Sequence, residues 1–208
     1  MGHWHLPGGF ELFFAVLIGL AQIARGDSGV LTEAQLSQKL RQYQSIVSVE
    51  APFKQIKTIK DMGLEIKSEG IFSLKRPRQV RWEILKPSPV LISMNDREIV
   101  LKTGTKKESH TQTFKFDEIP STKIAGSMTG LMAWLDLNSK DLYRQYEVFA
   151  DGDNRFKFIP RDKTASPFLN LVMKMNNKGL VEKVDINEVS GDSMSIVFGQ
   201  AKIMTKNP

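Results

Sequence analysis

The chain has 208 residues, 41% of them hydrophobic and 25% charged, a composition typical of a folded protein with one sizeable core. It contains no cysteine, which excludes disulfides, a thiolate nucleophile, cysteine metal sites and an anchoring lipid on cysteine. The net charge of +6 comes from lysines and arginines scattered along the chain, which argues against a nucleic-acid-binding protein because such proteins gather basic residues in a patch or stripe.

The first predicted element is the apolar run at residues 12–21. A bilayer-spanning helix needs about 20 residues, so this shorter run suits the core of a secretory signal peptide. Small residues suit cleavage before Asp27, and Gly19-Leu20-Ala21 offers another cleavage site. Residues 1–11 contain neither lysine nor arginine, which is unusual for a signal peptide, and a buried N-terminal helix is the alternative. The polar, turn-like segment directly after the run favours export. We therefore predict a signal peptide over residues 1–26 and one domain over residues 27–208.

A capping-box pattern predicts that the first helix begins at Thr32, with Gln35 at the third helical position. Leu36, Leu40 and Tyr43 follow at helical spacing, so the helix is predicted over about residues 32–45 with one apolar side.

Strand-like runs separated by short turns of Gly, Pro, Asn and Asp dominate the rest of the chain. We predict strands at residues 47–60, 64–74, 79–85, 90–94, 98–102, 111–116, 146–149, 155–159, 167–175, 180–189 and 193–198. Connections this short join antiparallel neighbours. A single sheet of about ten or eleven strands must curl or split to bury a face, so the fold class is α+β, mainly β.

Alternation along two late strands predicts which side chains share a face. It puts Leu169, Leu171, Met173 and Met175 on one face of their strand, and Leu180, Glu182, Val184, Ile186 and Glu188 on one face of the next.

A second helical pattern interrupts the strands. Its apolar face consists of Ile124, Met128, Leu131, Met132 and Leu135. Gly126 and Gly130 lie inside it, and each lowers helix stability by about 1 kcal/mol relative to alanine, which predicts a loosely held helix. Residues 139–142 suggest a further short turn. The two helices could together plug a curled, unclosed barrel.

The hairpin around Arg76-Pro77 carries the most informative pattern. Phe72, Leu74, Arg76, Val80, Trp82 and Ile84 share one parity and therefore one face of adjacent strands. Arginine is rarely buried without a partner. The face is therefore either an ordinary sheet core with Arg76 at its rim, or the wall of an apolar cavity closed by a polar side chain.

Patterns for catalysis and cofactor binding are missing from the sequence. His3 and His5 lie in the predicted leader and His110 stands alone, so no metal-binding cluster is formed. Residues 126–130 lack the lysine of a phosphate-binding loop, and no serine lies in a nucleophile-elbow pattern. We expect no enzymatic activity, no cofactor and no bound metal.

The order of motifs along residues 32–200 resembles the LolA-type periplasmic carriers of outer-membrane lipoproteins and their LolA-like relatives. The motifs are Phe53-x-Gln55, Gly70-x-Phe72-x-Leu74-x-Arg76-Pro77, Trp82-Glu83, Pro87, the Asn95-Asp96 turn, the Met- and Leu-rich helix, Phe156-x-Phe158-Ile159-Pro160 and a late Asn-Lys-Gly hairpin. The resemblance implies an incomplete antiparallel barrel covered by lid helices, with a cavity for acyl chains. It also implies that Arg76 is a latch that bonds to the lid helices and holds the empty cavity shut.

The resemblance also gives a set of cavity residues. They are Phe72, Leu74, Val80, Trp82 and Ile84 on the strands, Leu36 and Leu40 on the first helix, and Met128, Leu131 and Met132 on the second. Met128, Met132, Met173 and Met175 suit a deformable surface for acyl chains of varied shape, and plain core filling is the alternative.

The implied function is that of a monomeric carrier in the periplasm of a Gram-negative bacterium. It would take an acylated lipoprotein or another lipid from an inner-membrane donor complex and pass it to an outer-membrane acceptor. The lipid-anchored acceptor of the same fold is excluded by the absence of cysteine. The alternative is a sensor module that uses the same half-barrel to detect lipidated or misfolded partners without transfer. The chain ends at Pro208, where family members often continue into one more Phe-rich strand, so the resemblance predicts a sheet without that strand.

Overall fold

The computed structural model describes residues 29–77, 79–104, 108–118, 137–152, 154–164 and 166–205. The predicted signal peptide and the predicted second helix, with Met128, Leu131 and Met132, lie outside these ranges. Within the ranges, no helix is both long enough and apolar enough to cross a membrane.

The described part of the chain consists of two helices, one 3-10 turn and twelve strands. The helices are α2 (Glu33–Gln44) and α4 (Ser139–Gln145), and the turn is η1 (Lys60–Met62). The strands are β1 (Ile46–Ile59), β2 (Leu64–Lys75), β3 (Gln79–Lys86), β4 (Val90–Met94), β5 (Glu98–Gly104), β6 (Ser109–Lys115), β7 (Tyr146–Ala150), β8 (Arg155–Pro160), β9 (Phe168–Met175), β10 (Val181–Glu188), β11 (Ser193–Phe198) and β12 (Lys202–Thr205).

Helix α2 begins where the sequence predicts it. The Thr32 hydroxyl accepts the backbone N–H of Gln35 at 3.3 Å, and the Gln35 side-chain oxygen accepts the backbone N–H of Thr32 at 2.8 Å. This capping box satisfies two of the N–H groups that a helix start otherwise leaves unpaired. The apolar side of the helix, with Leu36, Leu40 and Tyr43, is buried.

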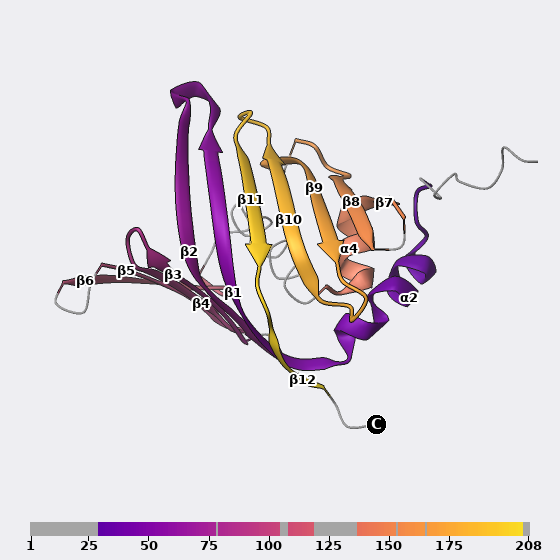
Figure 1. The fold of residues 1–208 in the computed structure, drawn as a ribbon, viewed down its shortest axis with the longest axis horizontal. Helices are drawn as coiled ribbons and strands as arrows, with labels where there is room; N and C mark the ends of the chain where they lie inside the picture. The colour runs from indigo at the N-terminus through magenta and orange to yellow at the C-terminus, as the bar shows by residue number, and fades with distance from the viewer. Residues whose placement is uncertain are drawn as a thin grey trace, which may run out of the picture.

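The strands form one antiparallel sheet in the order β6-β5-β4-β3-β2-β1-β11-β10-β9-β8-β7, with β12 added beside β1. The sheet curls strongly, and both helices lie beside the end formed by β7–β10 (Figure 1). In the described ranges β6 and β7 occupy the two ends of the order without pairing to each other, so the sheet is open. The predicted single, curled, unclosed antiparallel sheet is therefore confirmed.

Among the twelve described strands, β12 is the one that the sequence did not predict. β11 pairs with the second half of β1 from Phe53 onward, and β12 pairs with the first half, up to Glu50. Between the two pairings, the backbone N–H of Gly199 donates to the carbonyl oxygen of Pro52 at 2.8 Å. The segment between β11 and β12 therefore stays bonded to β1, and both strands pair along the same edge of β1.

The core fills the space between the curled sheet and the helices. Leu36, Leu40, Leu74, Leu137, Leu142, Val148, Phe156, Phe158 and Met173 are its most completely buried side chains. The side-chain amide of Gln44 donates to the carbonyl oxygen of Leu137 at 3.3 Å, which ties the end of α2 to the segment that leads into α4. Helix α4 is longer than the predicted short turn at residues 139–142 and is capped by the Asn138 side chain.

Candidate functional site

A cavity of about 360 Å³ lies against the inner face of the sheet, which we define as the face that carries Val49, Phe72 and Phe198. The side chains around it all belong to hydrophobic residue types. They are Tyr43, Val49, Ala51, Phe72, Trp82, Leu137, Phe168, Leu171, Met173, Leu180, Val181, Val184, Ile186, Ile196, Phe198 and Ala201. This lining favours an apolar ligand, because a polar ligand would lose hydrogen bonds to water that the cavity cannot replace.

A cluster of aromatic rings forms one wall of the cavity. The rings belong to Phe53, Phe72, Trp82 and Phe198. The ring centroid of Trp82 lies 4.3 Å from that of Phe53 and 5.6 Å from that of Phe72. A Cβ at Gly70 would collide with the carbonyl oxygen of Glu83 and lie 2.9 Å from the Phe53 ring. Glycine at this position therefore lets β3 and the Phe53 ring approach β2 closely.

Two β-bulges decide which side chains of β9 and β10 face the cavity. The pairing of these strands shifts register near each end of β10. At one shift Phe168 borders the cavity and Leu169 is 54% exposed. At the other Val181 borders the cavity, and the Glu182 carboxylate lies 3.4 Å from Lys174 Nζ. The prediction that Leu169 and Glu182 share a face with their neighbours of the same parity is wrong, because a bulge inserts one residue and reverses the alternation beyond it.

The residues that the sequence analysis assigned to the cavity fall into three groups. Phe72 and Trp82 border it, and so does Met173, which was singled out as a deformable contact. Leu36, Leu40, Leu74, Val80 and Met175 are buried in the surrounding core, and Ile84 packs against that core while partly exposed. Met128, Leu131 and Met132 lie outside the described residues.

Arg76 connects the β2–β3 turn to the junction of α2 and β1. Its Nε donates to the carbonyl oxygen of Ile46 at 2.8 Å, and its backbone N–H donates to the carbonyl oxygen of Val47 at 2.9 Å. The guanidinium carbon lies 5.3 Å from the ring centroid of Tyr43, which itself borders the cavity. Arg76 thus packs against the cavity residue Tyr43, which belongs to α2, the helix that precedes the sheet.

A charged cluster lies on the same inner face, toward the hairpin between β1 and β2. Lys57 Nζ lies 2.5 Å from Glu188 Oε1 and 3.5 Å from Asp192 Oδ2. The second oxygen of Asp192 accepts the backbone N–H of Lys60 at 3.0 Å. These contacts tie the β1–β2 hairpin to the β10–β11 turn, and the two project side by side in Figure 1.

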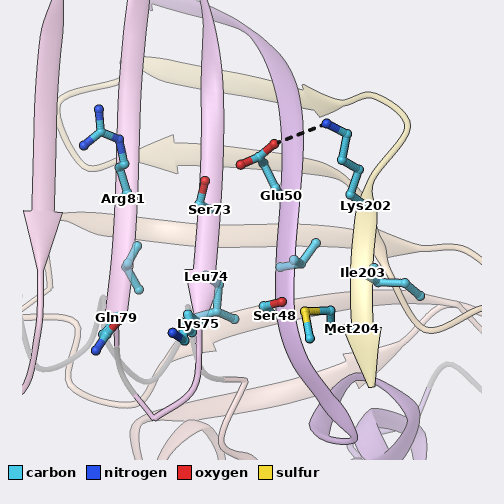
Figure 2. A pocket seen from close by; sticks show the side chains of 12 residues that line it. Ser48, Glu50, Ser73, Leu74, Lys75, Gln79, Arg81, Lys202, Ile203 and Met204 are labelled. Atoms are coloured by element: carbon cyan, nitrogen blue, oxygen red, sulfur yellow. Dashed lines mark ion pairs between the residues drawn. The ribbon is translucent and has the colours of Figure 1, made fainter. Parts of the chain in front are cut away.

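A second depression, of about 400 Å³, lies on the outer face of the sheet across β12, β1, β2 and β3. Its lining includes Ser48, Glu50, Ser73, Lys75, Gln79, Arg81, Lys202 and Met204 (Figure 2). Lys202 Nζ lies 3.8 Å from a carboxylate oxygen of Glu50. Because charged and polar side chains contribute to this lining, the depression is a poorer match to an apolar ligand than the inner cavity.

Most of the cavity lining was missed by the sequence analysis. Ile196 and Phe198 could have been found, because alternation along the last predicted strand puts them on one face. Phe168 and Val181 face the cavity only because of the bulges, for which the sequence offers no clear sign. The Lys57–Glu188 pair joins residues 131 positions apart, and only the strand order reveals it.

The family model described as outer membrane lipoprotein carrier protein LolA matches residues 44–207, which is most of the chain. The chain belongs to the LolA family. No curated protein matches the sequence closely enough to be called a relative.

Several solved structures resemble this LolA-family chain. A LolA superfamily protein from Nitrosomonas europaea shares 11% identity over 83% of this chain and 94% of its own, with a TM-score of 0.39. A putative outer membrane lipoprotein-sorting protein domain from Vibrio parahaemolyticus shares 8% identity over 83% of this chain and 92% of its own, with a TM-score of 0.41. The lipoprotein LppX from Mycobacterium tuberculosis shares 8% identity over 85% of this chain and 98% of its own, with a TM-score of 0.42.

Proposed function

We propose that this LolA-family chain is a periplasmic carrier that shields the acyl chains of a lipoprotein, or of another lipid, and delivers them to the outer membrane. The observation that carries the proposal is the wholly hydrophobic lining of the cavity on the inner face of an open sheet. Each methylene group removed from water contributes about 0.8 kcal/mol, so an acyl chain of ordinary length could gain on the order of 10 kcal/mol. The proposal includes no catalytic step.

The cavity residues take distinct parts in this proposal. Phe72 and Trp82 form a rigid aromatic wall, because their rings pack against each other and against neighbouring rings. Met173 offers a flexible side chain that can adapt to chains of different shape. Arg76 acts as the latch of the empty state, and its contacts with Ile46 and Tyr43 support that role.

The partners follow from the carrier role. An inner-membrane donor complex supplies the cargo and an outer-membrane acceptor receives it, while the protein itself travels as a monomer. The compartment between the membranes offers no nucleotide to drive the cycle, so loading and release depend on differences in binding free energy alone. The acceptor must therefore bind the acyl chains more tightly than the carrier does.

The test is to express the full chain in the periplasm of a Gram-negative bacterium and purify it without detergent. Native mass spectrometry and lipid extraction then identify any bound acylated species. The purified protein is next mixed with vesicles that carry an outer-membrane acceptor, and movement of the lipid is followed. We expect about one acylated molecule per protein and its passage to the acceptor.

A matched pair of variants links the result to the cavity. Ile196 faces the cavity, and its neighbour Val197 is exposed on the other face of the same strand. Ile196→Phe should lose most of the bound lipid because the added ring fills cavity space, and Val197→Phe should retain it. A protein that carries no lipid and takes up no acyl probe contradicts the proposal. A stable protein complex without transfer would identify the chain as a sensor instead.

A further inference from the structure

The inner face of the sheet continues past the cavity toward the β1–β2 hairpin. Along β11, Ile196 borders the cavity and pairs with Gln55, and the next inward residue, Met194, pairs with Lys57. Along β10, Glu188 follows the cavity residue Ile186 by two positions. Two residues of a strand span about 7 Å, so the Lys57–Glu188 pair lies about that far beyond the cavity lining on the same face.

The two ends of the cavity differ in their access to water. At the α2 end, Leu36, Leu40 and Leu142 are fully buried, so the core closes that end. At the hairpin end, Ile66, which pairs with Lys57 across β1 and β2, is 39% exposed, and Leu64 is 43% exposed. An amphiphile whose chain fills the cavity would therefore place its polar end at the hairpin side, beside Lys57.

The ammonium group of Lys57 is held in place but retains donor capacity. A lysine carries three N–H donors, and Glu188 is its hydrogen-bond acceptor among the described residues, with Asp192 as a second ion-pair partner at 3.5 Å. The Lys57 side chain is only 20% exposed. The one ammonium group of Lys57 faces the two carboxylates of Glu188 and Asp192, so the cluster offers donors without a net positive charge. Such a cluster suits a neutral acceptor better than an anion.

We propose that Lys57 donates a hydrogen bond to the ester or amide carbonyl of the cargo, at the point where its acyl chain leaves the cavity. This inference rests on the proposed function and adds a chemical preference to it: acyl-linked lipids over alkyl-linked lipids with the same chain and headgroup. The carbonyl is common to acylated lipoproteins and glycerophospholipids, so Lys57 recognises the linkage and not the headgroup.

The test compares two lysophosphatidylcholines that differ only at this linkage, a palmitoyl ester and a hexadecyl ether. Both are titrated below their critical micelle concentrations into the full chain, and their dissociation constants are measured by calorimetry. The wild-type protein should bind the ester about tenfold more tightly or better, the effect of one hydrogen bond from a charged donor. Lys57→Met keeps the apolar stem and removes the donor, so it should bind both lipids with the affinity that the wild type shows for the ether.

Lys54→Met is the matched control, because Lys54 lies on the outer face of the same strand, and it should keep the preference for the ester. If Lys57→Met fails to fold because Glu188 and Asp192 lose their partner, Lys57→Met combined with Glu188→Gln replaces it. Unchanged discrimination in the Lys57 variant, or none in the wild type, overturns this inference and leaves the carrier function standing. Failure of the wild type to bind either lipid overturns the proposed function itself.

Discussion

Arg76 is the residue at which the sequence pattern and the structure meet most directly. Its side chain donates to the carbonyl oxygen of Ile46 and lies over the ring of Tyr43, so one residue of the β2–β3 turn holds the start of β1 and the end of α2. A hydrogen bond from a charged group contributes about 1.5–3 kcal/mol, and a cation–π contact about 0.5–1 kcal/mol. If these contacts belong to the empty state, they favour release of the cargo.

Arg76→Leu should therefore bind acyl lipid but release it slowly. Removing the guanidinium destabilises the empty state relative to the loaded one, so the dissociation constant and the transfer rate both fall, each by roughly thirtyfold for a loss of about 2 kcal/mol. The rate at which a fluorescent acyl lipid passes to acceptor vesicles measures this directly. Arg81→Leu is the control, because Arg81 pairs with Glu83 away from the cavity. A normal transfer rate in Arg76→Leu contradicts the latch.

The predictability of the site depends on how regular the local pairing is. Phe72 and Trp82 could be placed on the cavity wall because β2 and β3 pair without interruption through that region. Phe168 and Val181 could not, because each lies at a register shift that reverses the alternation. Lys57 and Glu188 could not be joined either, since β1 and β10 do not pair but lie on either side of β11, and that strand order is a property of the whole sheet.

At the scale of elements, strong local signals predicted structure well and weak ones did not. The capping box fixed the start of α2, and the apolar spacing fixed its buried side. Strand β12 carried no such signal, because it has four residues, all of them exposed, and no alternation of apolar and polar side chains. It exists because the first half of β1 still needs a partner after β11 ends, as unpaired backbone groups are costly.

Ending the chain after Ala201 should remove β12 and destabilise the protein. The first half of β1, to which Arg76 bonds, would lose its pairing with β12. Glu50 would also lose its contact with Lys202. We expect the free energy of unfolding to fall by about 1–3 kcal/mol, as for the loss of a few net hydrogen bonds. Urea titration followed by circular dichroism measures it, and a chain ended after Thr205 serves as the control. Equal midpoints for the two truncated chains would show that β12 adds no stability.

For the whole molecule, the open sheet leaves an apolar cavity of about 360 Å³, which the proposed function fills with an acyl chain. The curled sheet of twelve described strands does not close, and in the proposed carrier its inner face is covered by helices and by cargo. A ligand that binds the folded state alone raises its stability by about 2.7 kcal/mol at a hundred times the dissociation constant. Stability and cargo binding are therefore coupled, and each reports on the other.

Saturation with palmitoyl lysophosphatidylcholine should raise the melting temperature of the wild-type protein by about 5–10 °C, since 1 kcal/mol corresponds to about 2–4 °C for a domain of this size. Ile196→Phe should show little shift, because its side chain occupies the space that the acyl chain needs, whereas Val197→Phe should behave as the wild type does. Glycerophosphocholine, which has the same headgroup without a chain, should produce no shift in any of the three proteins. Differential scanning fluorimetry provides the measurement. If Ile196→Phe shifts as much as the wild type, the lipid binds elsewhere, and the outer depression beside Glu50 and Lys202 becomes the site to test (Figure 2).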